Sequence, residues 1–163
     1  MKLSDGVEWS LHCAVVLASL PSEATLPGSA LAEFHGVSES YLLKHLKALT
    51  KTGILESVSG PKGGYRLAKQ AEDITLLDIV EAIEGTESAF RCREIRQRGP
   101  ACLEPSAYKL PCAINATMLQ AEQAWKAALR RQTLSDLVEH LGNNLDPRAI
   151  EKSGAWLQEN VRC

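Results

Sequence analysis

The sequence predicts a mainly α-helical fold with a small β-hairpin, and three observations support this prediction. Aromatic residues make up only 5% of the chain, so the core must consist largely of Leu, Ala, Val and Ile, which suits helices. Apolar residues recur at helical spacing along several segments. A Gly-rich stretch, 60–64, separates two short runs of strand character, at 54–58 and 65–67.

Three helices are expected before the hairpin, at residues 5–20, 28–35 and 38–52. The first places Val7, Leu11 and Val15 on one apolar face and stops before Pro21. A glycine directly follows each of the other two, as is usual at a helix C-terminus. Helix, tight turn, helix and then a Gly-rich hairpin is the order of elements in a winged helix-turn-helix.

After the hairpin, Thr75 can cap a further helix that runs through Ile83. Residues 86–111 contain Pro and Gly without sustained periodicity, and loops of this length are usually functional or disordered. A long amphipathic helix is then expected from about Cys112 to Arg131. Its apolar face consists of Ile114, Met118, Ala121, Trp125 and Leu129.

The helix at 38–52 has an apolar face and a polar, basic face, as a helix that enters the major groove requires. Residues 38–70 hold six basic and two acidic side chains, although the chain as a whole has a net charge of −2. Lysines alone would indicate only a solvated face, but a hairpin with Lys62 at its tip can also reach phosphates or a minor groove. The predicted contacts with double-stranded DNA are Ser38, Ser40, Tyr41, Leu43, Lys44, Lys47, Lys51, Pro61, Lys62, Gly63, Gly64 and Tyr65.

The expected location of the protein determines how its five cysteines are interpreted. Polar residues interrupt the N-terminal segment before a signal peptide can form, and no apolar run is long enough for a membrane span, so we expect a cytoplasmic protein without membrane contact. Five cysteines in such a compartment favour metal or redox chemistry over a disulfide framework. Cys13 is expected in the core and Cys163 at a frayed end.

Three segments resemble the winged-helix regulator family that includes IscR, NsrR, RsrR and CymR. They read Gly-Val-Ser-Glu-Ser-Tyr-Leu at 36–42, Gly-Pro-Lys-Gly-Gly-Tyr at 60–65, and Ile-Thr-Leu-Leu-Asp-Ile-Val-Glu-Ala-Ile-Glu-Gly at 74–85. The resemblance covers residues 1 to about 131, and segments 7–13 and 94–100 look most similar to RsrR. One departure is Ser59, which stands where family wings often carry Arg.

The resemblance implies a homodimer, built on the long helix, that binds a pseudo-palindromic operator as a repressor or activator. It also implies an iron–sulfur cluster in many members, held in the loop before that helix. The chain is therefore divided into a winged helix-turn-helix DNA-binding domain at 1–85, a cysteine-bearing sensor loop at 86–111, a dimerisation helix with a short following helix at 112–141, and a tail at 142–163 that can form a helix.

The sensor loop suits a cluster on chemical grounds, because five basic residues between 91 and 109 favour thiolates and offset the charge of a cluster. Cys92, Cys102 and Cys112 are spaced ten apart, wider than the usual family pattern. We therefore expect a 2Fe–2S cluster bound by Cys92 and Cys112 of one subunit and, as the resemblance implies, Glu8 and His12 of the other. Cys102 is a weaker candidate ligand, and Trp9 is expected to relay redox change.

Two alternatives remain at this point. The same three loop cysteines can form disulfides, which would give a redox-sensing regulator without a cluster. In a different class, the chain would be an iron–sulfur electron carrier or a metal-dependent enzyme. The sequence contains no His-Glu-x-x-His, Walker, Gly-x-Ser-x-Gly or Rossmann motif, so an enzyme is not expected.

Overall fold

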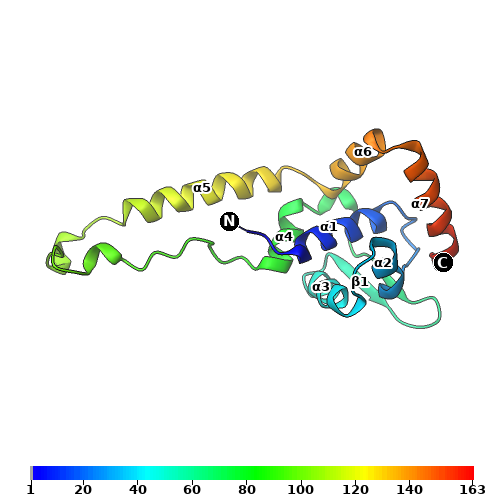
Figure 1. Ribbon diagram of the computed structural model, residues 1–163, viewed down its shortest axis with the longest axis horizontal. Helices are drawn as coiled ribbons and strands as arrows, with labels where there is room; N and C mark the ends of the chain where they lie inside the picture. The colour runs from blue at the N-terminus through cyan, green and yellow to red at the C-terminus, as the bar shows by residue number, and fades with distance from the viewer. Residues whose placement is uncertain (1) are drawn as a thin grey trace.

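The computed structural model describes residues 2–163, and Met1, where the predicted DNA-binding domain begins, lies outside them. The chain forms a head and an arm (Figure 1). The head contains the first four helices, the hairpin and the last two helices. The arm consists of the loop at 86–111 and the long helix α5, which extend together away from the head.

The predicted order of elements is confirmed. The helices are α1 (Asp5–Ala18), α2 (Gly28–His35), α3 (Glu39–Lys51), α4 (Leu76–Glu84), α5 (Ala113–Arg130), α6 (Leu134–Asn144) and α7 (Pro147–Asn160), and the strands are β1 (Leu55–Val58) and β2 (Gly64–Leu67). Short 3₁₀ turns occur at Ala71–Asp73, Ile95–Gln97 and Pro105–Ala107. The fold is therefore mainly α-helical with one small antiparallel sheet.

The core of the head lies between α1, α2, α3 and the base of the hairpin. Leu42, Leu46 and Leu49 of α3 are fully buried, and they meet Leu31 of α2 and Ala14 of α1. This stripe of leucines leaves the other face of α3 in solvent. In the hairpin, Leu55 pairs with Leu67 and Val58 pairs with Gly64, which leaves residues 59–63 as its tip.

Two similar capping arrangements join the arm back to the head. Thr75 caps α4 in a reciprocal capping box with Asp78, and Thr133 caps α6 in the same way with Asp136. The two caps lie side by side, because the Leu134 N–H donates to the Ile74 carbonyl oxygen at 2.7 Å. Helix α6 therefore begins on the head, and Leu134 is fully buried there.

Helix α5 carries an apolar face that the single chain does not cover. No side chain along the described helix Ala113–Arg130 is fully buried. Ile114 is 65% exposed and Met118 is 43% exposed, and Leu110 just before the helix is 76% exposed. At its other end α5 is fixed to α4 by Lys126, whose ammonium lies 3.2 Å from carboxylates of both Glu81 and Glu122.

The C-terminal tail is helical and packs on the head. Helix α6 continues to Asn144, three residues beyond the predicted boundary, before Asp146 caps α7. The Trp156 ring of α7 lies 5.1 Å from the Phe34 ring of α2. None of the helices formed by residues 2–163 is long and apolar enough to cross a lipid bilayer.

Candidate functional site

The outer face of α3 is an exposed polar surface of the head. Ser38 precedes the helix, and its hydroxyl lies 3.1 Å from the Ser40 hydroxyl. Tyr41 is 65% exposed although it is aromatic. The predicted cationic contacts, Lys44, Lys47 and Lys51, are all exposed along this face. A helix with this arrangement can present its first turn to base edges and its lysines to phosphates.

The predicted contact residues of the hairpin differ in exposure. Pro61 and Lys62 are exposed at the tip, whereas Gly63 is buried and both Gly64 and Tyr65 are half-buried. A Cβ on Gly63 would collide with the Val58 carbonyl oxygen, so the turn requires glycine there. The tip thus offers the Lys62 side chain to a ligand, while the glycines offer backbone only.

Leu43, one of the predicted DNA contacts, packs within the head. It is half-buried, and its side chain lies directly over Gly28 of α2. Tyr65 reaches the same place, because its ring also approaches Gly28. These two residues therefore lie where α2, α3 and the hairpin meet.

An aromatic cluster connects α1 to α3. The Trp9 ring lies 6.4 Å from the Tyr41 ring and 6.1 Å from the His45 ring, edge-on in both cases. The His45 ring covers Gly6, where any larger residue would collide with it. Burial lowers the pKa of His45, with a further contribution from Lys44. The Trp9 ring therefore packs α1 directly against α3.

Cys92 and Cys112, twenty residues apart in sequence, lie close together at the N-terminal end of α5, which is the end of this helix away from the head (Figure 1). Cys112 is the N-cap residue of α5, where unpaired backbone N–H groups stabilise a thiolate. Hydrogen bonding from the Asn115 N–H is the main reason that the pKa of Cys112 is lowered. The Ile114 N–H, the Cys92 thiol and the Arg96 guanidinium lower this pKa further.

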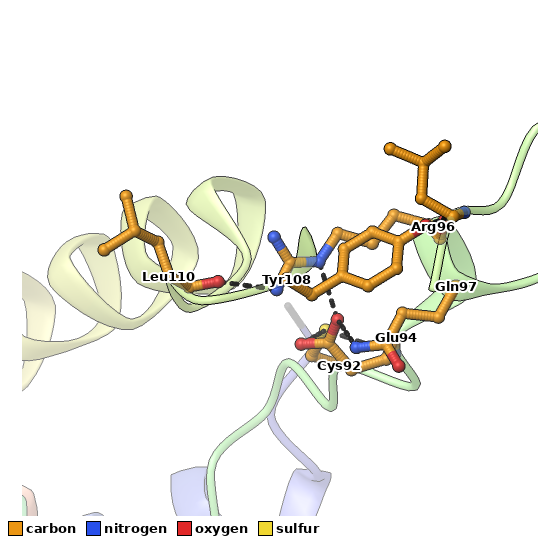
Figure 2. Close-up of polar contacts among 7 residues, drawn as sticks. Cys92, Glu94, Arg96, Gln97, Tyr108 and Leu110 are labelled. Carbon is orange, nitrogen blue, oxygen red and sulfur yellow. Dashed lines mark hydrogen bonds and ion pairs between the residues drawn. The ribbon is translucent and has the colours of Figure 1, made fainter. Parts of the chain in front are cut away.

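Arg96 joins the residues that follow Cys92 to the residues that precede Cys112 (Figure 2). Its Nε donates to Glu94 Oε2 at 2.7 Å, and its Nη2 donates to the Leu110 carbonyl oxygen at 2.8 Å. Glu94 in turn lies against the first cysteine, since its backbone N–H donates to Cys92 Sγ at 3.4 Å. The Arg96 ion pair lowers the pKa of Glu94, so this carboxylate stays ionised.

Tyr108 completes this network from the inner side of the loop. Its hydroxyl donates to the Arg96 carbonyl oxygen at 3.0 Å and accepts from the Leu103 N–H at 2.9 Å. The Arg96 guanidinium also lies 5.3 Å from the centre of the Tyr108 ring. The sensor loop is thus folded on itself around Arg96.

The other three cysteines occupy different environments. Cys13 is fully buried in the core, as predicted, and burial raises the pKa of its thiol to about 12. Cys102 and Cys163 are both exposed. Cys163 does not follow a frayed segment, because the backbone of the preceding Arg162 pairs with Thr25. Cys102 lies in a turn of the loop, where its N–H bonds the Gly99 carbonyl oxygen at 3.3 Å.

Glu8 and His12 project from α1 into solvent, one turn apart on the same face. They border an open, mostly apolar groove between α1 and α6, with Leu11, Val15, Leu137 and Leu141 on its walls. The His12 ring lies 5.7 Å from the ring of His35, a half-buried side chain whose pKa is lowered by burial and by His12. Glu8 and His12 are thus available to a partner that fills this groove.

One chain does not assemble the four predicted ligands. Within residues 2–163, no three His, Cys, Asp or Glu side chains are close enough to hold a metal ion together. The chain brings together Cys92 and Cys112, and separately Glu8 and His12. A site made of all four would therefore have to combine two subunits.

Sequence reasoning missed the residues that organise the loop. The sequence indicates Glu94 and Arg96 only as loop charges and as part of segment 94–100, and it does not single out Tyr108. Their spacings of two and twelve residues fit neither helix nor strand periodicity, so pattern analysis has no means of pairing them. The only signal available was the concentration of arginine around Cys92.

Comparison with known proteins identifies the family to which this chain belongs. Residues 3–140 match the model of the Rrf2 family, described as an iron-dependent transcriptional regulator. The HTH-type transcriptional regulator YwgB of Bacillus subtilis is 30% identical over 162 residues, which is 99% of this chain and 98% of YwgB. The relatives of this chain are transcriptional regulators, not enzymes.

Solved structures agree with this assignment. CymR, the global cysteine regulator of B. subtilis, is similar with a TM-score of 0.66 and 26% identity, over 86% of this chain and 98% of CymR. IscR of T. potens shares the fold with a TM-score of 0.66 and 23% identity, over 90% of this chain and 93% of IscR. The chain is a member of the Rrf2 family of DNA-binding transcriptional regulators.

Proposed function

We propose that this protein is a dimeric, sequence-specific transcriptional regulator that senses redox state at Cys92 and Cys112. The observation that carries the proposal is the pairing of these two thiols beside the N-terminus of α5. Family membership supports DNA binding and, commonly, a dimer. The uncovered apolar face of α5, with Ile114 and Met118 exposed, supports dimerisation through this helix.

In this proposal the two heads of the dimer bind a pseudo-palindromic operator. Each head places the start of α3, from Ser38 to Lys44, in a major groove, with Lys47 and Lys51 near phosphates. Lys62 at the hairpin tip reaches the neighbouring backbone or minor groove. The local excess of basic residues over 38–70 supports this orientation in a chain of net negative charge.

The residues present fit a 2Fe–2S cluster with mixed ligands. Cys112 has a lowered pKa, as a thiolate ligand requires, and Arg96 supplies a nearby positive charge. Glu8 and His12 of the partner would provide the remaining two ligands from the open groove beside α1. When bound, such a cluster would supply a one-electron redox change at this interface. The similarity to RsrR in segments 7–13 and 94–100 supports this ligand set.

Trp9 lies between the two α1 ligands and is the relay in this proposal. Its ring contacts both Tyr41 and His45 of α3. A change in how Glu8 or His12 is held would move α1 and reposition these two contacts. Binding of DNA and the state of the cysteine pair would then be coupled through a single packed contact.

A cluster-free thiol switch is the second candidate, and the same cysteine pair favours it. Oxidation of the Cys92 and Cys112 thiols by a peroxide would form one S–S bond, reduce the peroxide to water and alcohol or a second water, and remove one hydrogen from each sulfur. The similarity to CymR, which has also been solved in an oxidized form from Staphylococcus aureus, supports this reading. In this case Glu8 and His12 would have no role in sensing.

Anaerobic purification distinguishes the two candidates. A coloured protein with equal amounts of iron and sulfide supports the cluster, and His12→Ala should then shift or abolish its visible absorption. A colourless protein that gains a Cys92–Cys112 disulfide on treatment with peroxide supports the thiol switch. Both candidates require DNA binding. The three lysines that each head places near phosphates, six in the dimer, should make this binding depend steeply on salt. If neither the reduced nor the oxidised protein bound a duplex in a salt-dependent way, both candidates would be excluded.

A further inference from the structure

The C-terminal tail reaches across the head and contacts the tip of the hairpin. Arg162 Nη1 donates to the Gly63 carbonyl oxygen at 3.0 Å, a contact between residues 99 positions apart. This places the second-last residue of the chain against the segment that carries Lys62. The tail lies beyond residue 140, where the match to the family model ends.

Two isolated β-bridges, formed by Thr25 and Leu26, lie between the tail and the hairpin. The backbone of Thr25 pairs with that of Arg162, with N–H to carbonyl distances of 2.8 and 3.0 Å. The next residue, Leu26, pairs with Tyr65 of β2 on its opposite edge, at 3.1 and 2.7 Å. Since adjacent residues of an extended strand direct their hydrogen bonds to opposite sides, residues 25 and 26 join the tail to the hairpin.

Two carbonyl groups of the hairpin tip, those of Lys62 and Gly63, are held by this arrangement. The Thr25 hydroxyl donates to the Lys62 carbonyl oxygen at 2.8 Å, and Arg162 holds that of Gly63. Thr25 is 2% exposed and Gly63 is buried, whereas the Lys62 side chain is free in solvent. Thr25 and Arg162 therefore hold the backbone of the tip on its protein side, while the Lys62 side chain extends into solvent.

Helix α7 supplies the anchor from which Arg162 reaches the hairpin. Trp156 packs on Phe34, and Leu157 and Val161 pack against the core. This anchoring holds the tail near Arg162 in place without the guanidinium contact. The side chain of Arg162 can thus act on the tip without being required for the tail to fold.

We propose that Arg162 is a positioning residue for DNA binding, which holds the hairpin tip so that Lys62 meets the duplex. The proposal rests on the contact between the hairpin and DNA proposed above. It adds that affinity for DNA depends on the C-terminal residues, which themselves do not touch the duplex. Removing the guanidinium should loosen residues 60–65 and weaken DNA binding through Lys62.

A double-mutant cycle tests this with a duplex that the native protein selects from a random library. Arg162→Ala should weaken binding about three- to tenfold, the range expected for one hydrogen bond, and Thr25→Val should act similarly. Arg162→Lys should retain most of the affinity. Arg148→Ala is the matched control, because it removes an exposed α7 arginine paired only locally with Asp146.

The Lys62→Ala background separates the outcomes. If Arg162 positions Lys62, then Arg162→Ala has little further effect in that background. Additive losses, with the salt dependence reduced by a further phosphate contact, would mean that Arg162 binds DNA itself and would overturn the proposal. If Lys62→Ala alone left affinity unchanged, the proposed hairpin contact would fail instead.

Hydrogen exchange provides a readout that needs no DNA. Arg162→Ala should speed amide exchange of residues 60–65, where the Gly63 N–H bonds the Gly60 carbonyl oxygen, and leave α1 to α3 protected. Arg148→Ala should leave the tip unchanged. Equal exchange of the tip in the native protein and in Arg162→Ala would refute the positioning role.

Discussion

The Arg96 guanidinium donates to the Leu110 carbonyl oxygen at 2.8 Å, and this contact joins the two sides of a loop whose ends carry the two paired cysteines. Leu110 precedes Cys112 by two residues, and Glu94, the other partner of Arg96, follows Cys92 by two residues. The separation of the two sulfur atoms therefore depends on where Arg96 holds these neighbours. Cys112 caps α5, whereas Cys92 lies in no helix or strand that would fix its position independently.

Arg96→Ala is therefore expected to separate the cysteine pair. Crosslinking of Cys92 to Cys112 by dibromobimane, in reduced protein free of any cluster and with Cys102 and Cys163 replaced by serine, should slow about three- to tenfold, in line with loss of one charge-assisted hydrogen bond. Arg98→Ala removes a neighbouring exposed arginine and is the matched control. Equal crosslinking rates in both variants would show that Arg96 does not set the spacing.

Cys112 should be alkylated at a pH below that of an ordinary thiol. The thiolate is the reactive form, and the lowered pKa means that it persists as the pH falls. Peptide mass spectrometry after iodoacetamide treatment over a pH series gives the midpoint. Asn115→Pro removes the backbone donor that contributes most, so the midpoint should rise, whereas Asn115→Ala keeps that donor and should not change it. If the pH midpoint of Cys112 alkylation were the same in Asn115→Pro as in the native protein, the Asn115 N–H would not be the main cause of the lowered pKa.

Cys13 is predicted to act only through packing. Its thiol has a pKa of about 12 and is fully buried, so iodoacetamide at pH 8 should leave it unmodified in folded protein. Cys13→Ser buries a hydroxyl in the apolar core and should lower the free energy of unfolding by about 1–3 kcal/mol in urea denaturation. Cys13→Ala, which buries no polar group, should cost less. A larger loss for alanine than for serine would place a polar partner beside this position.

The elements that could be predicted from the sequence are those set by the spacing or chemistry of nearby residues. The leucine stripe of α3 and the caps at Thr75 and Thr133 follow helical periodicity and capping chemistry, so they could be located without the structure. The close approach of Cys92 to Cys112 was predictable only through family resemblance. The contacts of Arg96 with Leu110 and of Arg162 with Gly63 join irregular segments, and no spacing in the sequence encodes them.

Trp9 provides a test of how sensing would reach DNA. Trp9→Ala removes the contacts with Tyr41 and His45, so the ratio of DNA affinities between oxidised and reduced protein should fall toward one. Trp9→Phe keeps an aromatic ring at this position and should preserve part of the response. Fluorescence anisotropy with a labelled duplex measures both states. A full redox response in Trp9→Ala would remove Trp9 from the pathway.

The account depends most on ligands shared between two subunits, and a mixed dimer tests this directly. Cys112→Ala and His12→Ala should each abolish the visible absorption of the anaerobically purified homodimer. When the two variants are co-expressed with different tags and the mixed dimer is isolated, one site receives Cys92 and Cys112 from one subunit and Glu8 and His12 from the other. We predict half of the native absorption and iron content in this mixed dimer. A colourless mixed dimer alongside a coloured native protein would contradict a site built between subunits.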